Sequence, residues 1–467
     1  MKKRVLLVIS FIVFLGIGSY AAECSKKLVA YYTYYNSTVI PYNKLTHICH
    51  AFIFPESDGT VTSPWGYLEP SMNSAAHAAG VKVLVSIGGA DDAAKSNFST
   101  IAADAGLRQT FATSVYDFIS TNNYDGVDFD WEFPESYSDR ANQNLMIQAV
   151  RNKFNASPAP APNYIISMAT SSGDYRGKYN DYATLSNYVD FYNLMSYDYH
   201  GSWTTEVGPT SPLYYFDSEG CVSDSVYYMK TTRSVPAEKI NLGVPFYGLT
   251  YFSSTALHAY GSGTQLAYST IKSNYVDSSD WTVKYDNASK VPYVTKNTPP
   301  GIIVYDDAAS ILLKCNYALK TQGLGGIFMW EISHDEIGGN HPLLDSMYSA
   351  WSDACPVATP TPGAEDTTAK FSITNIKIYP NPIKKIGKVH LTFEIKGYQK
   401  IRVTIFNSNG EKLRMFEAAQ TDTSLDWNCG TANGELAASG LYVAMFEGID
   451  SKGNIFAVTS EKIALSY

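Results

Sequence analysis

Residues 125–132 read Asp-Gly-Val-Asp-Phe-Asp-Trp-Glu, with a carboxylate at every second position from Asp128 onward. Side chains alternate between the two faces of a β-strand, so this spacing puts Asp128, Asp130 and Glu132 on one face and apolar side chains on the other. The apolar face predicts packing against other elements. Three neighbouring acids are costly to bury, so we expect them to face a functional cavity rather than a packing interface.

This stretch is one of a series of eight apolar runs in the first three quarters of the chain. Each run is rich in Val, Ile, Leu, Phe and Met, as parallel strands buried on both faces are. Segments with helical spacing separate them, for example 107–121, 140–154 and 310–320. Eight strand–helix units predict an α/β fold, a (β/α)8 TIM barrel. The runs are 28–35, 47–55, 81–89, 126–132, 164–170, 191–198, 240–248 and 325–332.

Three other segments complete the predicted organisation. The interval 249–301 is too long for a simple loop, so we expect a small α+β insertion that walls a cleft in a barrel domain of residues 25–354. Residues 355–369 are rich in Pro, Thr, Ala and Gly and predict a linker. In residues 370–467 apolar and polar residues alternate between Asn-Gly turn signals, which predicts a C-terminal all-β sandwich.

The first residues are typical of a secretory signal peptide, which we assign to residues 1–22. Three basic residues precede an apolar run that ends in small residues, and the run is shorter than the roughly 20 residues that span a bilayer. We therefore expect a bacterial-type signal, a secreted or surface-bound protein and no membrane span. Six cysteines suit an exported protein. Cys24 and Cys355 bracket the barrel and are the predicted disulfide.

Composition narrows the partners. The net charge is −9 and no run rich in Lys and Arg follows the first residues, which argues against nucleic acid and anionic lipid. An aromatic content of 14% suits stacking on sugar rings, so a neutral polymer remains open. No phosphate loop or metal-ligand spacing occurs, so we expect no cofactor and no metal. We also expect a monomer. His200 and His334 are interpreted as hydrogen-bonding residues that fix loops.

Glu132 lies at the carboxyl end of its strand, the side on which TIM-barrel active sites open. Buried acids at close range repel one another, so at least one must keep its proton. A protonated carboxyl group at the rim suits a general acid that protonates a glycosidic oxygen. There are two alternatives to this interpretation. One is a solvent-exposed acidic strand, but the apolar residues Phe129 and Trp131 between the acids argue against it. The other is a metal site, but loops provide the ligands for hard cations more often than strands do.

Five motifs along the barrel segments carry a family resemblance. They are Ser-Ile-Gly-Gly at 86–89, Asp-x-x-Asp-x-Asp-x-Glu at 125–132, Met-Ser-Tyr-Asp at 195–198, Gly-Val-Pro-Phe-Tyr-Gly at 243–248 and Gly-Ile-Phe-Met-Trp-Glu at 326–331. Together they resemble glycoside hydrolase family 18, the chitinases, over nearly all of residues 25–354. Ala90 stands where many members carry Trp, and Leu249 where many carry Arg. Both departures concern sugar subsites rather than the acid.

The resemblance implies a retaining, substrate-assisted hydrolysis of β-1,4-linked N-acetylglucosamine polymers. Glu132 protonates the leaving oxygen, and the 2-acetamido oxygen of the substrate attacks the anomeric carbon to give an oxazolinium intermediate. Asp130 orients the acetamido N–H and stabilises its charge, and Asp128 shares a proton with Asp130. Tyr197 hydrogen-bonds the acetamido oxygen.

Six further residues are assigned to substrate binding from their places in these motifs and strands. Trp330 resembles the floor of the −1 sugar subsite, with a buried core tryptophan as the alternative. Met195 is predicted to line the pocket floor, but ordinary packing inside the barrel explains it nearly as well. Trp203 is predicted to line the cleft, but the anchoring of its own loop explains it equally well. The set is Tyr31, Asp125, Met195, Asp198, Trp203 and Trp330.

The tail resembles the immunoglobulin-like modules that follow many bacterial secreted enzymes. The resemblance rests on Tyr379-Pro-Asn-Pro382, Trp427 and Gly440-Leu-Tyr442-Val. Some of these modules are type IX secretion signals, and others resemble the flagellar-hook-cap β-sandwich. The resemblance implies sorting by secretion machinery to the cell surface, with a passive spacer and polysaccharide binding as alternatives.

Two other functions compete with a chitinase. An endo-β-N-acetylglucosaminidase acting on N-glycans uses the same chemistry, although the Met-x-Tyr-Asp motif and the insertion favour chitin. A non-catalytic chitin-binding lectin on the same barrel typically loses the acid residue, whereas Glu132 is present here.

Overall fold

The computed structural model shows two compact units, residues 1–359 and 360–467, each with its own hydrophobic core. The predicted signal peptide, residues 1–22, and the predicted linker beyond its first residue lie outside the described residues. The described residues are 24–156, 163–355, 372–384, 387–396, 400–407, 412–419, 421–431, 434–449 and 455–466.

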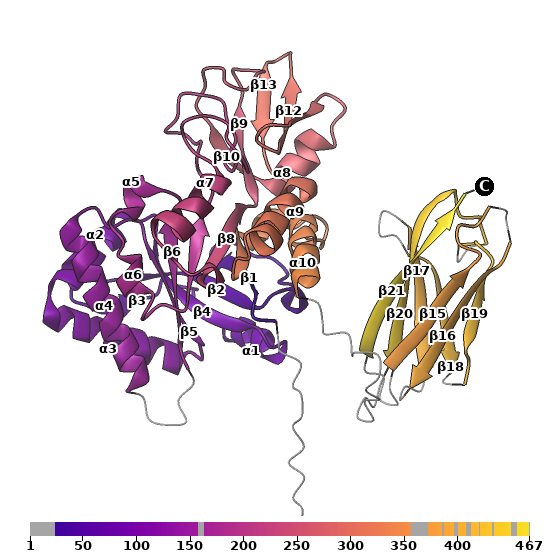
Figure 1. The fold of residues 1–467 in the computed structure, drawn as a ribbon, viewed down its shortest axis with the longest axis horizontal. Coiled ribbons are helices and arrows are strands. Elements are labelled where there is room, and N and C mark those ends of the chain that lie inside the picture. The colour runs from indigo at the N-terminus through magenta and orange to yellow at the C-terminus, as the bar shows by residue number, and fades with distance from the viewer. Residues whose placement is uncertain are drawn as a thin grey trace, which may run out of the picture. The chain divides into compact units, whose positions relative to one another are not determined.

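The first unit contains a closed barrel of eight parallel strands, which confirms the predicted TIM barrel (Figure 1). The strands are β1 (Lys27–Thr33), β2 (His47–Pro55), β4 (Lys82–Gly89), β5 (Gly126–Trp131), β6 (Ile165–Ser171), β7 (Phe191–Met195), β8 (Ile240–Pro245) and β14 (Gly326–Trp330). β1 pairs in parallel with both β14 and β2, which closes the sheet. A short strand, β3 (Val61–Thr62), pairs antiparallel with the end of β2.

Helices connect the strands and surround the barrel. Several begin at a capping side chain: Asp91, Asp104, Ser136 and Asp307 each accept a hydrogen bond from a backbone N–H in the first turn of α2, α3, α4 and α9, respectively. The helices are α1 (Pro70–Ala78), α2 (Asp92–Ala103), α3 (Ala105–Thr121), α4 (Tyr137–Asn155), α5 (Asp174–Gly177), α6 (Tyr182–Leu185), α7 (Val222–Tyr227), α9 (Ala308–Asn316) and α10 (Pro342–Ala354).

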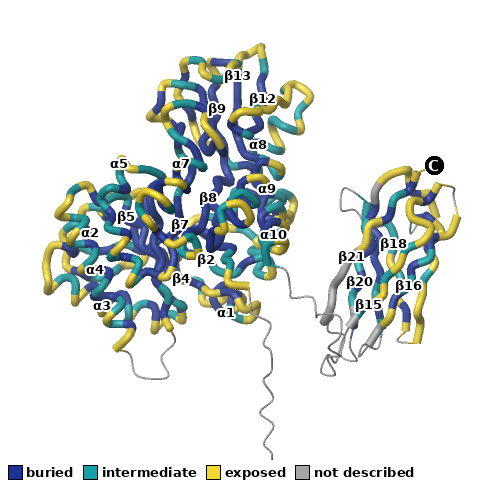
Figure 2. Tube along the Cα trace, in the orientation of Figure 1, coloured by how far each residue is buried: buried dark blue, intermediate teal, exposed yellow. Residues whose placement is uncertain are grey.

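β5 has the predicted alternation of its side chains. Phe129 and Trp131 belong to the core between the barrel and its helices, where the Trp131 ring stacks on Phe98 with centroids 5.4 Å apart. Asp128 and Asp130 therefore point into the barrel, although both are almost completely buried. Figure 2 shows most residues of the barrel strands as buried.

The insertion is wider than the predicted interval 249–301. β8 ends at Pro245, and Tyr247 already starts the first strand of a separate five-stranded antiparallel sheet. Figure 1 shows this sheet and α8 (Tyr268–Ile271) as a lobe on one side of the barrel. Its strands are β9 (Tyr247–Tyr251), β10 (Thr264–Ala267), β11 (Thr282–Asp286), β12 (Val291–Lys296) and β13 (Gly301–Val304).

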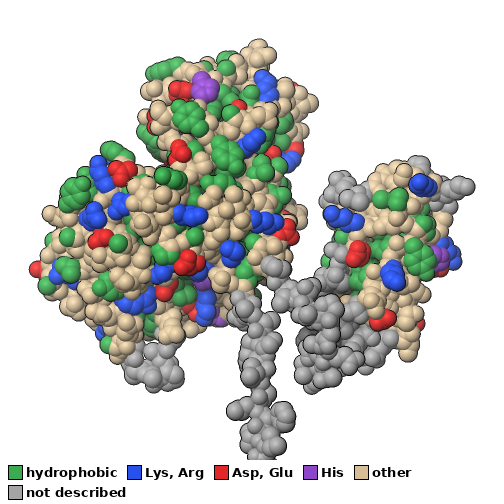
Figure 3. All heavy atoms as spheres, in the orientation of Figure 1, with side chains coloured by type: hydrophobic (Ala, Val, Ile, Leu, Met, Phe, Trp, Pro, Cys, Tyr) green, Lys and Arg blue, Asp and Glu red, His purple; other side chains and the backbone are tan. Residues whose placement is uncertain are grey.

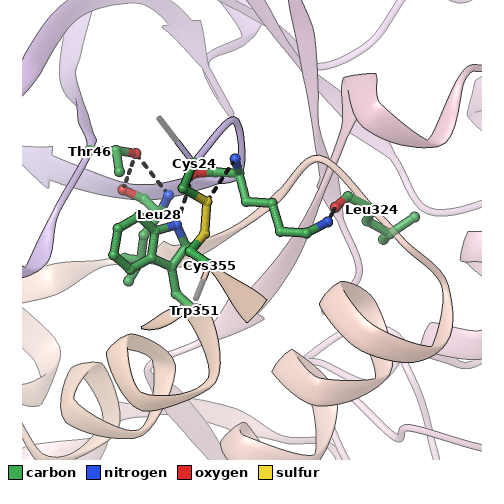
Figure 4. The surroundings of a disulfide bond; sticks show 7 residues. Cys24, Leu28, Thr46, Leu324, Trp351 and Cys355 are labelled. Carbon is green, nitrogen blue, oxygen red and sulfur yellow. Dashed lines mark hydrogen bonds between the residues drawn. A yellow bond between two sulfur atoms is a disulfide. The ribbon is translucent and has the colours of Figure 1, made fainter. Parts of the chain in front are cut away.

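A disulfide between Cys24 and Cys355 joins the two ends of the barrel unit, as predicted (Figure 4). Beside it, Trp351 Nε1 on α10 donates to the Lys26 carbonyl at 2.8 Å, and Lys26 Nζ donates to the Leu324 carbonyl at 2.7 Å. These contacts fix α10 against the start of β1.

The described part of the second unit is a β-sandwich of a three-stranded and a four-stranded sheet. Their orders are β15-β16-β19 and β18-β17-β20-β21. Side chains from both sheets form one core around Trp427, whose Nε1 donates to the Gly430 carbonyl at 2.9 Å. The strands are β15 (Ser372–Tyr379), β16 (Val389–Lys396), β17 (Lys400–Asn407), β18 (Lys412–Ala419), β19 (Ser424–Trp427), β20 (Gly440–Ile449) and β21 (Ile455–Leu465).

Two surface properties bear on partners. Among the described residues, no helix has both the length and the apolar character needed to cross a bilayer. In Figure 3 acidic and basic side chains are interspersed over the visible face of the barrel unit.

Candidate active site

The carboxyl ends of the barrel strands surround a cavity of about 430 Å³, a size typical of small-ligand sites. Aromatic side chains and carboxylates dominate its walls. The lining residues are Tyr31, Tyr35, Phe52, Phe54, Gly88, Gly89, Ala90, Asp91, Asp130, Glu132, Ala169, Met195, Tyr197, Asp198, Tyr247, Gln265 and Trp330.

Asp128 lies inside the barrel, and four side chains from four other strands donate hydrogen bonds to it. Ser167 Oγ and Asn193 Nδ2 donate to Oδ1 at 2.5 and 3.4 Å. Tyr31 and Ser86 hydroxyls donate to Oδ2 at 2.9 and 2.7 Å. Burial raises the pKa of Asp128, and these four donors oppose that rise by stabilising the carboxylate.

Asp130 lacks such donors. It is 3% exposed, and its Oδ1 has no hydrogen-bond partner among the described residues. Burial raises its pKa well above the ordinary value, and the negative charges of Glu132 and Asp128 raise it further. Gly88 on β4 allows this close packing, because a Cβ there would lie 2.3 Å from the Asp130 carbonyl oxygen. Burial and the neighbouring carboxylates therefore both disfavour the charged form of Asp130 until a positive charge develops beside it.

Glu132 follows the last residue of β5 and lies at the rim of the cavity. Burial raises its pKa to about 7, and the charge of Asp198 contributes to the shift. A carboxyl group with a pKa near neutrality can both give and take a proton at physiological pH. Glu132 is therefore suited to general acid and then general base catalysis.

Tyr197 and Asp198 follow β7, which only β6 separates from β5 in the barrel. Asp198 adopts a φ of +63°, so β7 cannot continue through it as the run 191–198 had predicted. Its Oδ1 accepts hydrogen bonds from Tyr247 Oη at 2.6 Å and Gln265 Nε2 at 3.4 Å. These contacts hold the Asp198 carboxylate at the cavity wall.

An aromatic surface lies beneath the acids. The Trp330 ring is 5.5 Å from the Tyr31 ring and stacks on Phe52 with centroids 5.7 Å apart. Trp330 is only partly buried and lines the cavity, as does Met195. This surface offers flat apolar contact to a bound ring.

Two predicted substrate-binding residues lie outside this cavity. Asp125 precedes β5 at its other end and accepts hydrogen bonds from Lys82 Nζ, the Val83 N–H and His77. A strand rises about 3.3 Å per residue, so the length of β5 separates Asp125 from the rim and corrects that assignment. Trp203 is largely exposed and covers Gly201, where a Cβ would lie 2.5 Å from its ring, and it does not line this cavity.

Several contributors were not among the predicted site residues. Ser167 and Asn193 support Asp128, and their signal was a polar residue within an otherwise apolar strand run. Tyr247 belonged to a motif already recognised. Gln265 had no sequence signal, because it reaches the cavity from the insertion.

Glu132, a carboxyl group with a raised pKa, lies at the face of the barrel where the active sites of TIM-barrel enzymes open, and it is suited to acid–base catalysis. Residues 27–335 match the family described as Glycosyl hydrolases family 18, and the chain belongs to this family. Residues 377–451 match a second family, the Secretion system C-terminal sorting domain. This match favours the sorting interpretation of the tail.

Three similar proteins illustrate the relationship. Chitinase A1 of Niallia circulans is 26% identical over 81% of this chain, which spans only 56% of that protein's length. Chitinase 1 of Aphanocladium album is 28% identical over 66% of this chain and 79% of its own. The structure of a glycoside hydrolase family 18 N-acetylglucosaminidase from Paenibacillus barengoltzii matches with a TM-score of 0.62 and 27% identity, covering 70% of this chain and 99% of that one.

Proposed function

We propose that this protein is a secreted chitinase that hydrolyses β-1,4-linked N-acetylglucosamine polymers by substrate-assisted catalysis. The observation that carries the proposal is Glu132, whose pKa is raised to about 7 at the rim of a cavity that also contains the buried Asp130. Chitinases among the similar proteins support the same substrate class.

In the first step Glu132 gives its proton to the glycosidic oxygen, and the bond from that oxygen to the anomeric carbon breaks. The substrate's 2-acetamido carbonyl oxygen forms a new bond to the anomeric carbon, which gives an oxazolinium ion. The acetamido N–H becomes more acidic as positive charge develops on the ring. In the proposed reaction Asp130, which lines the cavity, accepts this hydrogen bond as a carboxylate and opposes the developing charge.

In the second step the ionised Glu132 takes a proton from water. The resulting hydroxide equivalent attacks the anomeric carbon, the bond to the acetamido oxygen breaks, and the product keeps its original anomeric configuration. Glu132 is protonated again and ready for another cycle. One carboxyl group performs both proton transfers, which fits a pKa close to neutral pH.

The walls of the cavity suit the other parts of the sugar. Tyr197 and Asp198 both line this cavity, and in the proposed complex the Tyr197 hydroxyl donates to the acetamido oxygen. Trp330 provides a flat floor for the pyranose ring. The hydrogen bonds around Asp128 fix the strand on which Asp130 and Glu132 depend.

A substrate panel tests the proposal. The protein should cleave N-acetylated chitooligosaccharides and fail on fully deacetylated chains of the same length, because the attacking oxygen is then absent. A second arm uses a glycoprotein with N-linked glycans. Release of glycan without cleavage of chitooligosaccharides would instead establish the endo-β-N-acetylglucosaminidase, and binding to chitin without any turnover would establish the lectin.

We also propose that a signal peptide exports the chain and that the C-terminal unit directs it to the cell surface or the medium as a monomer. The match of residues 377–451 to a sorting domain supports this route. Deletion of residues 370–467 should leave the enzyme cell-associated inside the outer envelope while its activity on soluble oligomers persists. Unchanged export of the truncated chain would contradict a sorting role.

A further inference from the structure

Four potential metal ligands converge where the insertion contacts the loop after β7. His200, Glu206 and Asp217 belong to that loop, and His258 belongs to the β9–β10 connection of the insertion. One ligand atom each from Glu206, Asp217 and His258 lie within 4.8 Å of one another. His200 Nε2 lies 2.9 Å from Asp217 Oδ2.

His200 is completely buried, and its orientation is unusual for an ordinary hydrogen-bonding histidine. Its Nδ1 lies 3.2 Å from the Pro209 carbonyl oxygen, which favours a proton on Nδ1 and leaves a lone pair on Nε2. That lone pair faces a carboxylate oxygen at 2.9 Å, yet neither Nε2 nor Asp217 Oδ2 has a hydrogen bond of acceptable geometry among the described residues. Two acceptors so close together require a positive species near them.

We propose that these side chains bind one divalent transition-metal ion of the zinc type. Two imidazoles and two carboxylates are a donor set that Zn²⁺ accepts, and a histidine whose other nitrogen binds a backbone carbonyl is the usual arrangement around it. Asp217 supplies the central oxygen. His258 Nδ1 lies 2.6 Å from Glu206 Oε1 and both side chains are partly exposed, so in the proposed site a bound ion takes the place of the proton between them.

The ion would connect the insertion to the loop that carries Asp198. Backbone hydrogen bonds already join the two segments: the Val207 N–H donates to the Ala259 carbonyl at 2.8 Å, and the Gly261 N–H to Thr205 at 3.0 Å. The His258 ring also stacks on Phe216, with centroids 4.0 Å apart. A metal ion here fixes the insertion, which supplies Gln265 to the cavity, relative to the barrel.

The sequence predicted no metal because these ligands are far apart along the chain. His258 comes from a different segment than the other three, and no pair has the short spacing typical of zinc sites. The folded arrangement alone brings them together.

The test uses the full chain after removal of metal with a chelator. Titration with Zn²⁺ followed by calorimetry should show one site, and Zn²⁺ should raise the midpoint of thermal unfolding. Asp217→Asn and His258→Gln should each weaken binding by about tenfold or more and abolish the shift of the midpoint. Co²⁺ in place of Zn²⁺ should give visible absorption bands in the parent chain, and these bands should be lost in Asp217→Asn and His258→Gln.

Glu219→Gln is the matched control, because Glu219 is exposed in the same loop and contacts Asp217 only through its backbone N–H. It should bind Zn²⁺ as the parent chain does. Equal Zn²⁺ affinity in the parent, Asp217→Asn and His258→Gln would place any bound ion elsewhere and overturn the proposal. No binding by the parent would also overturn it, and would leave a proton on His200 as the positive species.

Discussion

The pKa values of the carboxyl groups at the two ends of β5 are shifted in opposite directions. At the amino end, burial alone would raise the pKa of Asp125, but Lys82, the Val83 N–H and His77 outweigh it and hold that pKa below the ordinary value. At the carboxyl end, Asp130 and Glu132 have raised pKa values. No lysine or arginine is among the described residues that line the cavity.

The difference shows how one strand separates stability from chemistry. A carboxylate with cationic partners stays ionised and contributes to the folded state. A carboxyl group that is buried beside other acids binds a proton more readily, because its charged form is destabilised, and at Glu132 this provides an acid for catalysis. Substitutions at the two ends should therefore differ in kind: turnover should fall at one end and stability at the other.

The largest effect is expected at Glu132. Glu132→Gln removes the transferable proton and keeps the shape of the side chain, so kcat on chitooligosaccharides should fall by about 10²–10⁴-fold or more. Substrate binding should persist, as measured by calorimetry with an uncleaved oligomer. Glu135→Gln is the control, since Glu135 lies three residues further along and pairs with Arg176 at 2.8 Å. A Glu132→Gln variant with near-normal kcat would disprove the assignment of the acid.

The next largest effect is expected at Asp130. Asp130→Asn replaces a group that can become negative with a neutral amide, which stabilises an oxazolinium ion less well. We expect kcat to fall by about 10²–10³-fold, with a smaller change in KM. The ratio of the two parameters on chitotetraose measures this. A loss confined to KM would mean that Asp130 binds the sugar without supporting the reaction.

A smaller effect concerns pH. Glu132 must be protonated to act as the acid, so kcat/KM should decline as pH rises through about 7. Asp198→Asn removes a nearby negative charge that favours the protonated form, so the pKa of Glu132 should fall and the decline should begin at lower pH. A profile of kcat/KM against pH compares the variants, with Glu135→Gln as the control. The same alkaline limb in Asp198→Asn would exclude this coupling.

Much of the fold and of the acid site was accessible from the sequence. Apolar runs of strand length predicted the barrel, because buried parallel strands tolerate few polar residues, and the alternation 128–130–132 predicted which side chains share a face. Seven of the ten predicted site residues line the cavity: Tyr31, Asp130, Glu132, Met195, Tyr197, Asp198 and Trp330. Asp128 lies directly below them.

The remaining features depend on contacts between distant segments. Periodicity could not show that Asp125 faces Lys82, because that pairing arises only when β4 and β5 are side by side. Nor could it place Gln265, which depends on how the insertion folds back over the barrel. β7 ends at Met195, earlier than the apolar run had predicted, and the left-handed backbone at Asp198 is a feature that side-chain patterns do not encode.

The smallest expected effect on activity is at the amino end of β5. Asp125→Asn removes the negative charge that Lys82 contacts at 2.8 Å and weakens two further hydrogen bonds, so the free energy of unfolding at neutral pH should fall by about 1 kcal/mol. Because the folded-state pKa of Asp125 is lowered, this contribution is present above the unfolded-state pKa and disappears as pH falls through the folded-state value. Denaturant unfolding at neutral and at acidic pH measures this, and kcat/KM should be unchanged.

Asp117→Asn, on an exposed position of α3, serves as the control. A large loss of kcat/KM without loss of stability would return Asp125 to the substrate site and remove the contrast between the two ends of the strand.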